Sequence, residues 1–297
     1  MTHDERVLPW RLRRPRSVAR FLSPAVRREA AERGVDPATL WGSGAGGRVT
    51  RADVRRAGGP AGRGDEVVPF GTVRRRAAAA LLASKRTAAH ALVVTAADYS
   101  AVEEVRRTAR DEWRAREGFP LTYLPFVARA VVDAVGEFPL VNATVPDGEE
   151  VLVVHRDVHL GIAVDLDFAG LVVPVVRGAD GLRLRAIARA VHDLAARARS
   201  RRLSPDDLAG GTFTITNPGA AGTWISFPVL NRPQVAILAT DGVSKRVVAD
   251  GRGRLGVAPV GHLCLAFDHR VLDGAYAAGF LDRVRRIVEE RDWWAEL

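Results

Sequence analysis

The most informative stretch of this 297-residue chain is Phe267-Asp268-His269-Arg270-Val271-Leu272-Asp273-Gly274. It closes an apolar run that begins at Leu263 and has the composition of a buried strand. Strand ends that open into tight turns can hold reactive side chains on a rigid scaffold. Two interpretations are open from these residues alone. His269 is a general base, a usual role of histidine near neutral pH, or it only ends the strand in a surface turn.

Outward from this segment, helical and β-rich patterns alternate along the chain. Helical spacing of apolar residues occurs at 73–86, 100–117, 122–136, 183–200 and 275–290. Runs rich in β-formers occupy 91–97, 151–164, 171–176, 212–216, 234–239 and 262–267. This alternation predicts an α/β sandwich with a mixed sheet.

The overall composition is that of a chain with a sizeable core. Hydrophobic residues make up 47%, no apolar run is long enough to span a membrane, and the N-terminus lacks the apolar core of a signal peptide. The single cysteine, Cys264, cannot form a disulfide within the chain, so a cytoplasmic location is expected. We interpret Cys264 as a core residue, because no sequence neighbour would stabilise its thiolate.

The chain is strongly basic, with a formal charge of +9, and all but two of its 44 basic residues are arginine. A basic balance can indicate nucleic-acid binding. However, the sequence contains no aromatic-basic RNA motif and no zinc-ligand spacing, so we expect neither nucleic acid nor a metal. A phosphate-bearing cofactor and acidic partner surfaces explain the charge at least as well.

The N-terminal part divides into three segments. Residues 1–18 are basic and irregular, which predicts a flexible tail. Residues 19–57 form a compact helical unit, and 58–65 (Gly-Gly-Pro-Ala-Gly-Arg-Gly-Asp) form a linker. The large domain then spans 66–297.

Within the compact unit, two helices flank a glycine-rich loop. Ser23-Pro24 predicts the start of the first helix, with Val26, Ala30 and Ala31 on one face. Thr50 reads as the N-cap of the second helix. The loop between them, 41–48, could cradle a phosphate, but it lacks the Gly-Lys-Ser/Thr ending of a nucleotide-binding loop and follows no strand.

The pattern Asp-His-Arg-x-x-Asp-Gly resembles the active-site signature of the dihydrolipoamide acyltransferases. These are the core components of 2-oxo acid dehydrogenase complexes, and they share a fold with chloramphenicol acetyltransferase. Further segments resemble the family in its order: 84–90, 121–126, 138–143, 170–175, 211–217 and 233–238. The resemblance implies a CoA-dependent acyltransferase fold, a two-layer α/β sandwich with a mixed sheet, preceded by a small helical subunit-binding domain.

The resemblance also implies a reaction and a set of catalytic residues. The reaction is acyl transfer between a dihydrolipoyl thiol and coenzyme A. His269 would take the proton from the attacking thiol. Thr216 falls where the family places its oxyanion-stabilising hydroxyl, although it is otherwise an ordinary β-former near a strand end. Asp273 would orient the imidazole, or else hold the turn by pairing with an arginine.

Coenzyme A carries phosphates, so cationic side chains are expected near its channel. Arg75, Lys85 and Arg86 are our candidates. With so many arginines in the chain, the sequence alone does not choose among them.

Residues 19–57 resemble the peripheral subunit-binding domain of the same enzymes. That domain binds the 2-oxo acid decarboxylase or dihydrolipoamide dehydrogenase through arginines that face acidic residues. Arg27 and Arg48 fall on matching positions, whereas Ala31 occupies a position where a third basic residue is common. Arg27 and Arg48 are therefore the predicted partner contacts.

Nothing in the sequence resembles a lipoyl domain, so the lipoyl group is expected in trans, on a separate lipoyl-bearing protein. The resemblance further implies a homotrimer or a larger core, with active sites shared between subunits. Three functions stay open: the core acyltransferase of a 2-oxo acid dehydrogenase complex, a stand-alone CoA-dependent acyltransferase for a small hydroxyl, amine or thiol, and a non-catalytic scaffold. The paired tryptophans Trp293 and Trp294 either dock onto a partner or fold back onto their own core.

Overall fold

The computed structural model describes residues 22–40, 42–57, 68, 70–148, 150–249 and 252–297. The predicted tail (1–18) and linker (58–65) lie outside these described residues. The chain divides into two compact units, Met1–Ala78 and Ala79–Leu297. No helix in the described part of the chain has the length and hydrophobicity needed to cross a membrane.

The first unit holds two short helices, α1 (Pro24–Glu32) and α2 (Arg51–Ala57), and two 3-10 turns, η1 (Pro37–Thr39) and η2 (Ala45–Gly47). As predicted, the Ser23 side chain caps α1 by accepting a hydrogen bond from the Val26 amide. Val26 and Ala30 pack against Val54 in a small core. The prediction that Ala31 shares this face is wrong, because its side chain is exposed.

Glu29 occupies the buried position that Ala31 does not, and it is only 6% exposed. Its carboxylate accepts hydrogen bonds from Arg33, Arg51 and Arg55, at 2.8–3.3 Å. Hydrogen bonds from Arg55, Arg51 and Arg33 lower the pKa of Glu29 to about 2. A buried carboxylate is tolerated only with such compensation, and this one fastens α1 to α2.

The glycine-rich loop is held closed by its own contacts. A Cβ at Gly42 would lie 2.2 Å from the carbonyl carbon of Arg48, so only glycine fits there. The Asp53 carboxylate accepts hydrogen bonds from the amides of Ser43 and Thr50 and from the Thr50 hydroxyl, at 2.8–2.9 Å. These amides are therefore already bonded within the loop, which disfavours the phosphate-cradle alternative.

The second unit is built on a seven-stranded sheet with the order β1-β11-β9-β8-β4-β7, to which β10 is added beside β11. The β8 strand is parallel to both β4 and β9, and the other pairs are antiparallel. The predicted mixed sheet is thus confirmed. Its strands are β1 (His90–Asp98), β4 (Leu160–Ile162), β7 (Val175–Val176), β8 (Phe213–Thr216), β9 (Ala236–Thr240), β10 (Ser244–Ala249) and β11 (Leu255–Asp268).

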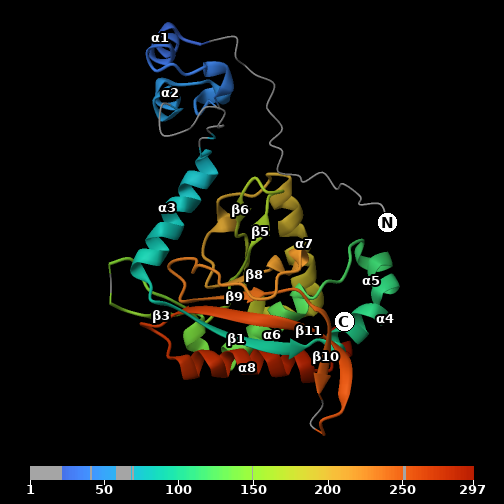
Figure 1. Ribbon diagram of the computed structural model, residues 1–297. Coiled ribbons are helices and arrows are strands. Elements are labelled where there is room, and N and C mark those ends of the chain that lie inside the picture. The colour runs from blue at the N-terminus through green and yellow to red at the C-terminus, as the bar shows by residue number, and fades with distance from the viewer. Residues whose placement is uncertain (1–21, 41, 58–67, 69, 149, 250–251) are drawn as a thin grey trace. The chain divides into compact units, whose positions relative to one another are not determined.

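Helices of the second unit cover one face of this sheet (Figure 1). Apart from α3 (Thr72–Thr87), which begins in the first unit, they are α4 (Ser100–Thr108), α5 (Arg110–Glu117), α6 (Leu124–Glu137), α7 (Leu184–Arg199) and α8 (Gly274–Glu290). The remaining elements are short: β2 (Ala143–Thr144) with β3 (Val153–Val154), β5 (Val164–Asp165) with β6 (Leu171–Val172), and the 3-10 turns η3 (Pro139–Val141), η4 (Ala179–Gly181), η5 (Asp206–Leu208), η6 (Pro218–Ala221) and η7 (Trp294–Glu296).

Alternation along β11 sorts its side chains onto the two faces of the sheet. Leu265 and Phe267 belong to the large core that includes Phe280 of α8. Ala266 belongs instead to a small cluster with Leu230 and Ile237. The sheet therefore has a helix-covered face and an opposite face, and the second one carries the cavity described below.

The structure differs from the predicted elements in several places. The helix predicted at 100–117 breaks at Ala109 into α4 and α5, and the run 151–164 is interrupted into short strands. The β10–β11 hairpin was not predicted beyond 262–267, because two glycines and Pro259 within 255–261 mask the strand pattern. This hairpin exposes Val247 and Val257, which lie opposite each other.

Of the two terminal tryptophans, one folds back onto the core. Trp293 is 1% exposed, meets the ring of Phe126 edge-on and donates its indole N–H to the carbonyl of Val288. Trp294 is 48% exposed. The second of the two interpretations therefore holds for Trp293, and only Trp294 presents aromatic surface.

Candidate functional site

The predicted base, His269, directly follows the last residue of β11 and has an exposed side chain. Its amide donates a hydrogen bond of 2.8 Å to the carbonyl of Ala89, in the segment between α3 and β1. The backbone on either side of the imidazole is therefore anchored to a neighbouring segment, while the ring itself stays accessible.

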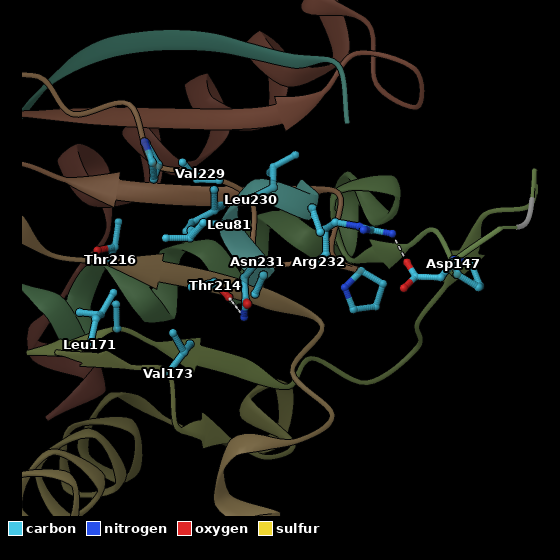
Figure 2. Close-up of a pocket in the computed structure, with 17 residues that line it drawn as sticks. Leu81, Asp147, Leu171, Val173, Thr214, Thr216, Val229, Leu230, Asn231 and Arg232 are labelled. Carbon is cyan, nitrogen blue, oxygen red and sulfur yellow. Dashed lines mark hydrogen bonds and ion pairs between the residues drawn. The ribbon is translucent and has the colours of Figure 1, made fainter. Parts of the chain in front are cut away.

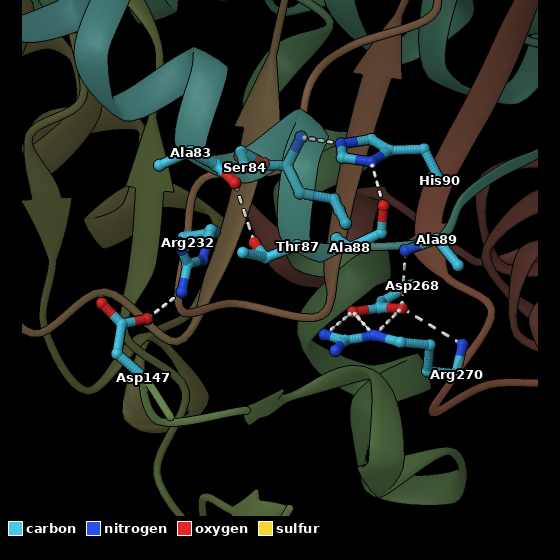
Figure 3. Close-up of polar contacts among 11 residues, drawn as sticks. Ala83, Ser84, Thr87, Ala88, Ala89, His90, Asp147, Arg232, Asp268 and Arg270 are labelled. Atoms are coloured by element: carbon cyan, nitrogen blue, oxygen red, sulfur yellow. Dashed lines mark hydrogen bonds and ion pairs between the residues drawn. The ribbon is translucent and has the colours of Figure 1, made fainter. Parts of the chain in front are cut away.

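Asp268, the last residue of β11, organises this turn. Its carboxylate accepts hydrogen bonds from the Ala89 amide and from the amide and guanidinium of Arg270 (Figure 3). Burial opposes ionisation of Asp268, but the hydrogen bonds from Arg270 and Ala89 outweigh it and keep the carboxyl pKa below its usual value. Asp268 and Arg270 thus position the residue between them. Neither residue was predicted to have a role, although both stand inside the motif.

Asp273 is the N-cap residue of α8, and its side chain makes no capping hydrogen bond. Its side chain is exposed. Among the described residues, the acid of this motif that forms an ion pair with an arginine is Asp268. An orienting role for Asp273 therefore stays a prediction.

His90 has both ring nitrogens engaged by the backbone (Figure 3). Nδ1 lies 3.1 Å from the carbonyl oxygen of Ala88, and Nε2 accepts a hydrogen bond of 3.2 Å from the amide of Leu230. A carbonyl can only accept, so these two partners fit the imidazole tautomer that has its proton on Nδ1. This histidine joins the start of β1 to the loop before β9 and is structural.

Thr216 ends β8 and lines a cavity of about 690 Å³ on the sheet face opposite the helices (Figure 2). Thr214 and Ile237, one strand apart, line the same cavity, as the two-residue alternation of β8 requires. The other lining residues are Ala80, Leu81, Ala83, Pro146, Asp147, Ala163, Leu171, Val173, Pro228, Val229, Leu230, Asn231, Arg232 and Pro233. A volume of this size suits a small-molecule site.

The loop that supplies one wall of the cavity is fastened by a buried carboxylate, Asp241. It accepts hydrogen bonds from the Thr223 hydroxyl (2.6 Å) and from the amide and hydroxyl of Ser226 (3.1 and 2.7 Å). The thiol of Cys264 donates to the same carboxylate at 3.3 Å. Burial, together with the Asp241 carboxylate, raises the pKa of Cys264 to about 12. This thiol is a buried hydrogen-bond donor, in agreement with its interpretation as a core residue.

Thr216 and His269 do not meet within one chain. The sheet register aligns Thr216 with Ala239, and Ala239 with Cys264. His269 lies five residues beyond Cys264 along the chain, so strand geometry puts it roughly 15–20 Å from Thr216. No rotation of the two side chains closes such a gap. If both predicted residues act in one site, they therefore belong to different chains.

The three predicted cationic residues all lie on α3. Arg75 is on α3, where its guanidinium donates to the carbonyl of Phe70 at 2.7 Å. Lys85 and Arg86 are exposed in the last turn of α3, where cations also favour the helix dipole. The Lys85 ammonium lies 4.8 Å from the ring centre of Phe227.

Both predicted partner contacts are exposed in the first unit. Arg27 projects from α1 and donates to the carbonyl of Leu22 at 3.3 Å, and Arg48 is the last residue of the glycine-rich loop. In the described part of the chain, no group of histidine, cysteine or acidic residues is arranged to hold a metal ion.

Comparison with known families gives two matches that divide the chain. Residues 62–295 match the 2-oxoacid dehydrogenases acyltransferase catalytic domain. Residues 20–55 match the e3 binding domain. Neither is a lipoyl domain.

Three relatives represent three kinds of complex. The lipoamide acyltransferase component of the branched-chain alpha-keto acid dehydrogenase complex of Bacillus subtilis is 34% identical, over 91% of this chain and 71% of the relative. The succinyltransferase component of the Escherichia coli 2-oxoglutarate dehydrogenase complex is 34% identical, over 91% and 70%. The acetyltransferase component of the Mycobacterium tuberculosis pyruvate dehydrogenase complex is 36% identical, over 93% and 56%, so this chain spans little more than half of it.

Solved structures agree with these matches. Dihydrolipoamide acetyltransferase of Azotobacter vinelandii superposes with a TM-score of 0.73 at 32% identity, over 78% of this chain and 94% of that one. Its crystallographic and enzymatic investigation addressed the role of a serine, a histidine and an asparagine in its catalytic mechanism. The cubic core of the pyruvate dehydrogenase multienzyme complex gives a TM-score of 0.72, also at 32% identity and over 78% and 94%.

Proposed function

Because the chain belongs to the 2-oxoacid dehydrogenase acyltransferase family, we propose that it transfers an acyl group between a dihydrolipoyl thiol and coenzyme A, as the core component of a 2-oxo acid dehydrogenase complex. The observation that supports this best is the apolar cavity that Thr216 lines, within a domain matched to the family over residues 62–295. The e3 binding match argues against a stand-alone enzyme, which has no use for such a domain.

In the proposed reaction, the CoA sulfur attacks the thioester carbonyl of an S-acyl dihydrolipoyl group. His269 takes the proton of the CoA thiol as the new carbon–sulfur bond forms. The hydroxyl of Thr216 donates a hydrogen bond to the oxyanion of the tetrahedral intermediate. As the intermediate collapses, the dihydrolipoyl sulfur leaves and receives the proton from His269. Asp273 helps to order the imidazole in this proposal.

We propose that two subunits share each site, with His269 from one and Thr216 from the other, in a homotrimer or a larger core. The separation of roughly 15–20 Å within one chain supports this arrangement. A cyclic trimer supplies it, because each interface then brings one surface of a chain against a different surface of its neighbour. The cubic core among the similar structures is consistent with further assembly.

Arg75, Lys85 and Arg86 are the proposed contacts for the phosphates of coenzyme A. Two of them, Lys85 and Arg86, are exposed on the last turn of α3. Guanidinium and ammonium groups there can pair with phosphate while they remain solvated.

The first unit is proposed to bind dihydrolipoamide dehydrogenase, the 2-oxo acid decarboxylase, or both, through Arg27 and Arg48. Replacing Arg27 and Arg48 with alanine should weaken binding of the full chain to whichever of these two enzymes is its partner. The loss should be largest at low ionic strength, because the pairing is electrostatic. Calorimetric titration at two salt concentrations measures it. Arg28→Ala is the control, since it removes the same charge from the next position of α1. Equal affinities of the double variant and the wild type at low salt would contradict the assignment.

We further propose that the lipoyl group is carried by another chain. The two matched regions, 20–55 and 62–295, include no lipoyl domain. A lipoylated domain from the same organism should then be a better substrate than free dihydrolipoamide, because docking raises the local concentration of the thiol. Measured kcat/KM values for the two thiols, and for small hydroxyl and amine acceptors, test the function. If a hydroxyl or an amine acceptor is clearly preferred, the proposed function is wrong and the protein is a stand-alone acyltransferase.

A further inference from the structure

The wall of the cavity around Thr216 is apolar. Leu81, Val229, Leu171 and Val173 surround it in Figure 2, and they come from α3, from the loop before β9 and from the segment that begins with β6. Whatever group is held next to the Thr216 hydroxyl is therefore in contact mainly with aliphatic side chains.

The charged residues of the cavity are already paired. Among the described residues that line it, Asp147 and Arg232 carry the charges, and they form an ion pair with each other. Figure 2 shows this pair at the opposite side of the cavity from Thr216.

Two neutral polar residues of the cavity, Thr214 and Asn231, are also hydrogen-bonded. The hydroxyl of Thr214 donates to the amide oxygen of Gln234 at 2.6 Å, and Gln234 in turn donates to the carbonyl of Gly211 at 2.8 Å. Asn231 lies at the limit of hydrogen bonding to the same hydroxyl, at 3.5 Å. Within one chain, the described residues that line the cavity thus offer a buried carboxylate no unpaired cation.

We propose that the acyl group handled at this site is an uncharged aliphatic one, straight or branched, and not a dicarboxylic acyl group such as succinyl. This inference rests on the proposed function, which brings an acyl thioester to Thr216. A second carboxylate would lose its hydration among aliphatic side chains without gaining an ion pair, and such burial is strongly unfavourable. A hydrocarbon chain gains from the same contacts.

The size of the cavity agrees with this occupant. At about 690 Å³ it exceeds what a short acyl group needs. The space suffices for the acyl group together with part of the dihydrolipoyl chain, which is itself a hydrocarbon. Family membership does not indicate which acyl group is used. The relatives from branched-chain, 2-oxoglutarate and pyruvate dehydrogenase complexes match the chain at 34%, 34% and 36% identity.

The direct test compares acetyl-CoA, isobutyryl-CoA and succinyl-CoA as donors to dihydrolipoamide with the full chain. Both neutral donors should exceed succinyl-CoA in kcat/KM by at least about 100-fold, as expected from burial of an unpaired charge. A succinyl preference would overturn the inference and leave the proposed function standing. Absence of transfer to the thiol from all three donors, with transfer to a hydroxyl or amine, would overturn the function itself.

A second test places a cation in the cavity. Leu81 lines it and is 48% exposed, so Leu81→Arg adds a guanidinium without opening the core. The ratio of kcat/KM for succinyl-CoA to that for isobutyryl-CoA should rise at least about tenfold, the effect of one new charge pair at a partly exposed position.

Two matched controls isolate the effect of that charge. Leu82→Arg adds the same guanidinium at the next position of α3, which is 57% exposed and is not one of the cavity-lining residues. Leu81→Gln changes polarity at Leu81 without charge. Only Leu81→Arg should change the ratio. If Leu81→Arg leaves it unchanged, or if Leu82→Arg changes it equally, the cavity is not where the acyl group binds.

Discussion

Replacing His269 with alanine should lower the rate of acyl transfer by a factor of about 10² to 10⁴, the usual contribution of a general base. The side chain is exposed at the end of β11, and the turn is held by its backbone and by Asp268. The fold should therefore be retained. Steady-state rates with an acyl-CoA and dihydrolipoamide measure the loss, and thermal unfolding checks the fold.

His192→Ala is a matched control for this substitution. His192 stacks on Phe119 at 4.2 Å between ring centres and belongs to α7, on the helix-covered side of the sheet. This substitution also removes one histidine, and it should leave the rate near that of the wild type. Activity of His269→Ala close to that of His192→Ala would remove His269 from the mechanism.

The second large change in activity should follow replacement of Thr216, and it should be partly reversed when two inactive chains are mixed. Thr216→Val alone should cost a factor of about 10² to 10³, as for other oxyanion donors. Refolded together in equal amounts, Thr216→Val and His269→Ala chains should regain about one quarter of wild-type activity. If each site is shared between two chains of a cyclic trimer, random assembly leaves both Thr216 and His269 intact at about one quarter of the interfaces.

A doubly substituted chain supplies the control for mixing. Wild-type chains refolded with an equal amount of the Thr216→Val, His269→Ala double variant should keep about one quarter of full activity if sites are shared, and about one half if each site lies within one chain. Co-refolding avoids any dependence on exchange between assembled cores. Recovery of one half here, with none in the first mixture, would show that each chain holds a complete site.

Much of the fold could be predicted because its signals are local. Apolar spacing located α3, α6, α7 and α8, and the apolar run before His269 located the end of β11. The segment 267–274 also locates the end of β11 and the start of α8, because an apolar strand residue, polar residues and a glycine lie next to each other in sequence.

The sequence could not predict contacts that join distant segments. The separation of Thr216 from His269 depends on the registers between β8, β9 and β11, and no local pattern contains a register. No local pattern marks Asp241, which accepts hydrogen bonds from a loop and from Cys264. The backbone there is so close that a Cβ at Gly219 would lie 2.7 Å from the carbonyl carbon of Asp241.

Glu29 illustrates the same limit within a small unit. A glutamate on a short helix is normally expected at the surface. Here three arginines, two of them more than twenty residues away in the chain, make its burial possible. The choice between Ala31 and Glu29 for the buried face was therefore made by tertiary ion pairs and not by hydrophobicity.

The distance between Thr216 and His269 has a consequence for any kinetic study of this protein. An enzyme with complete sites in each chain keeps its specific activity on dilution. Under the proposed shared arrangement, turnover per chain should fall once the protein is diluted below the dissociation constant of its assembly. A substrate that contacts both chains should oppose this loss by mass action, so saturating substrate and high dilution act in opposite directions on the same equilibrium.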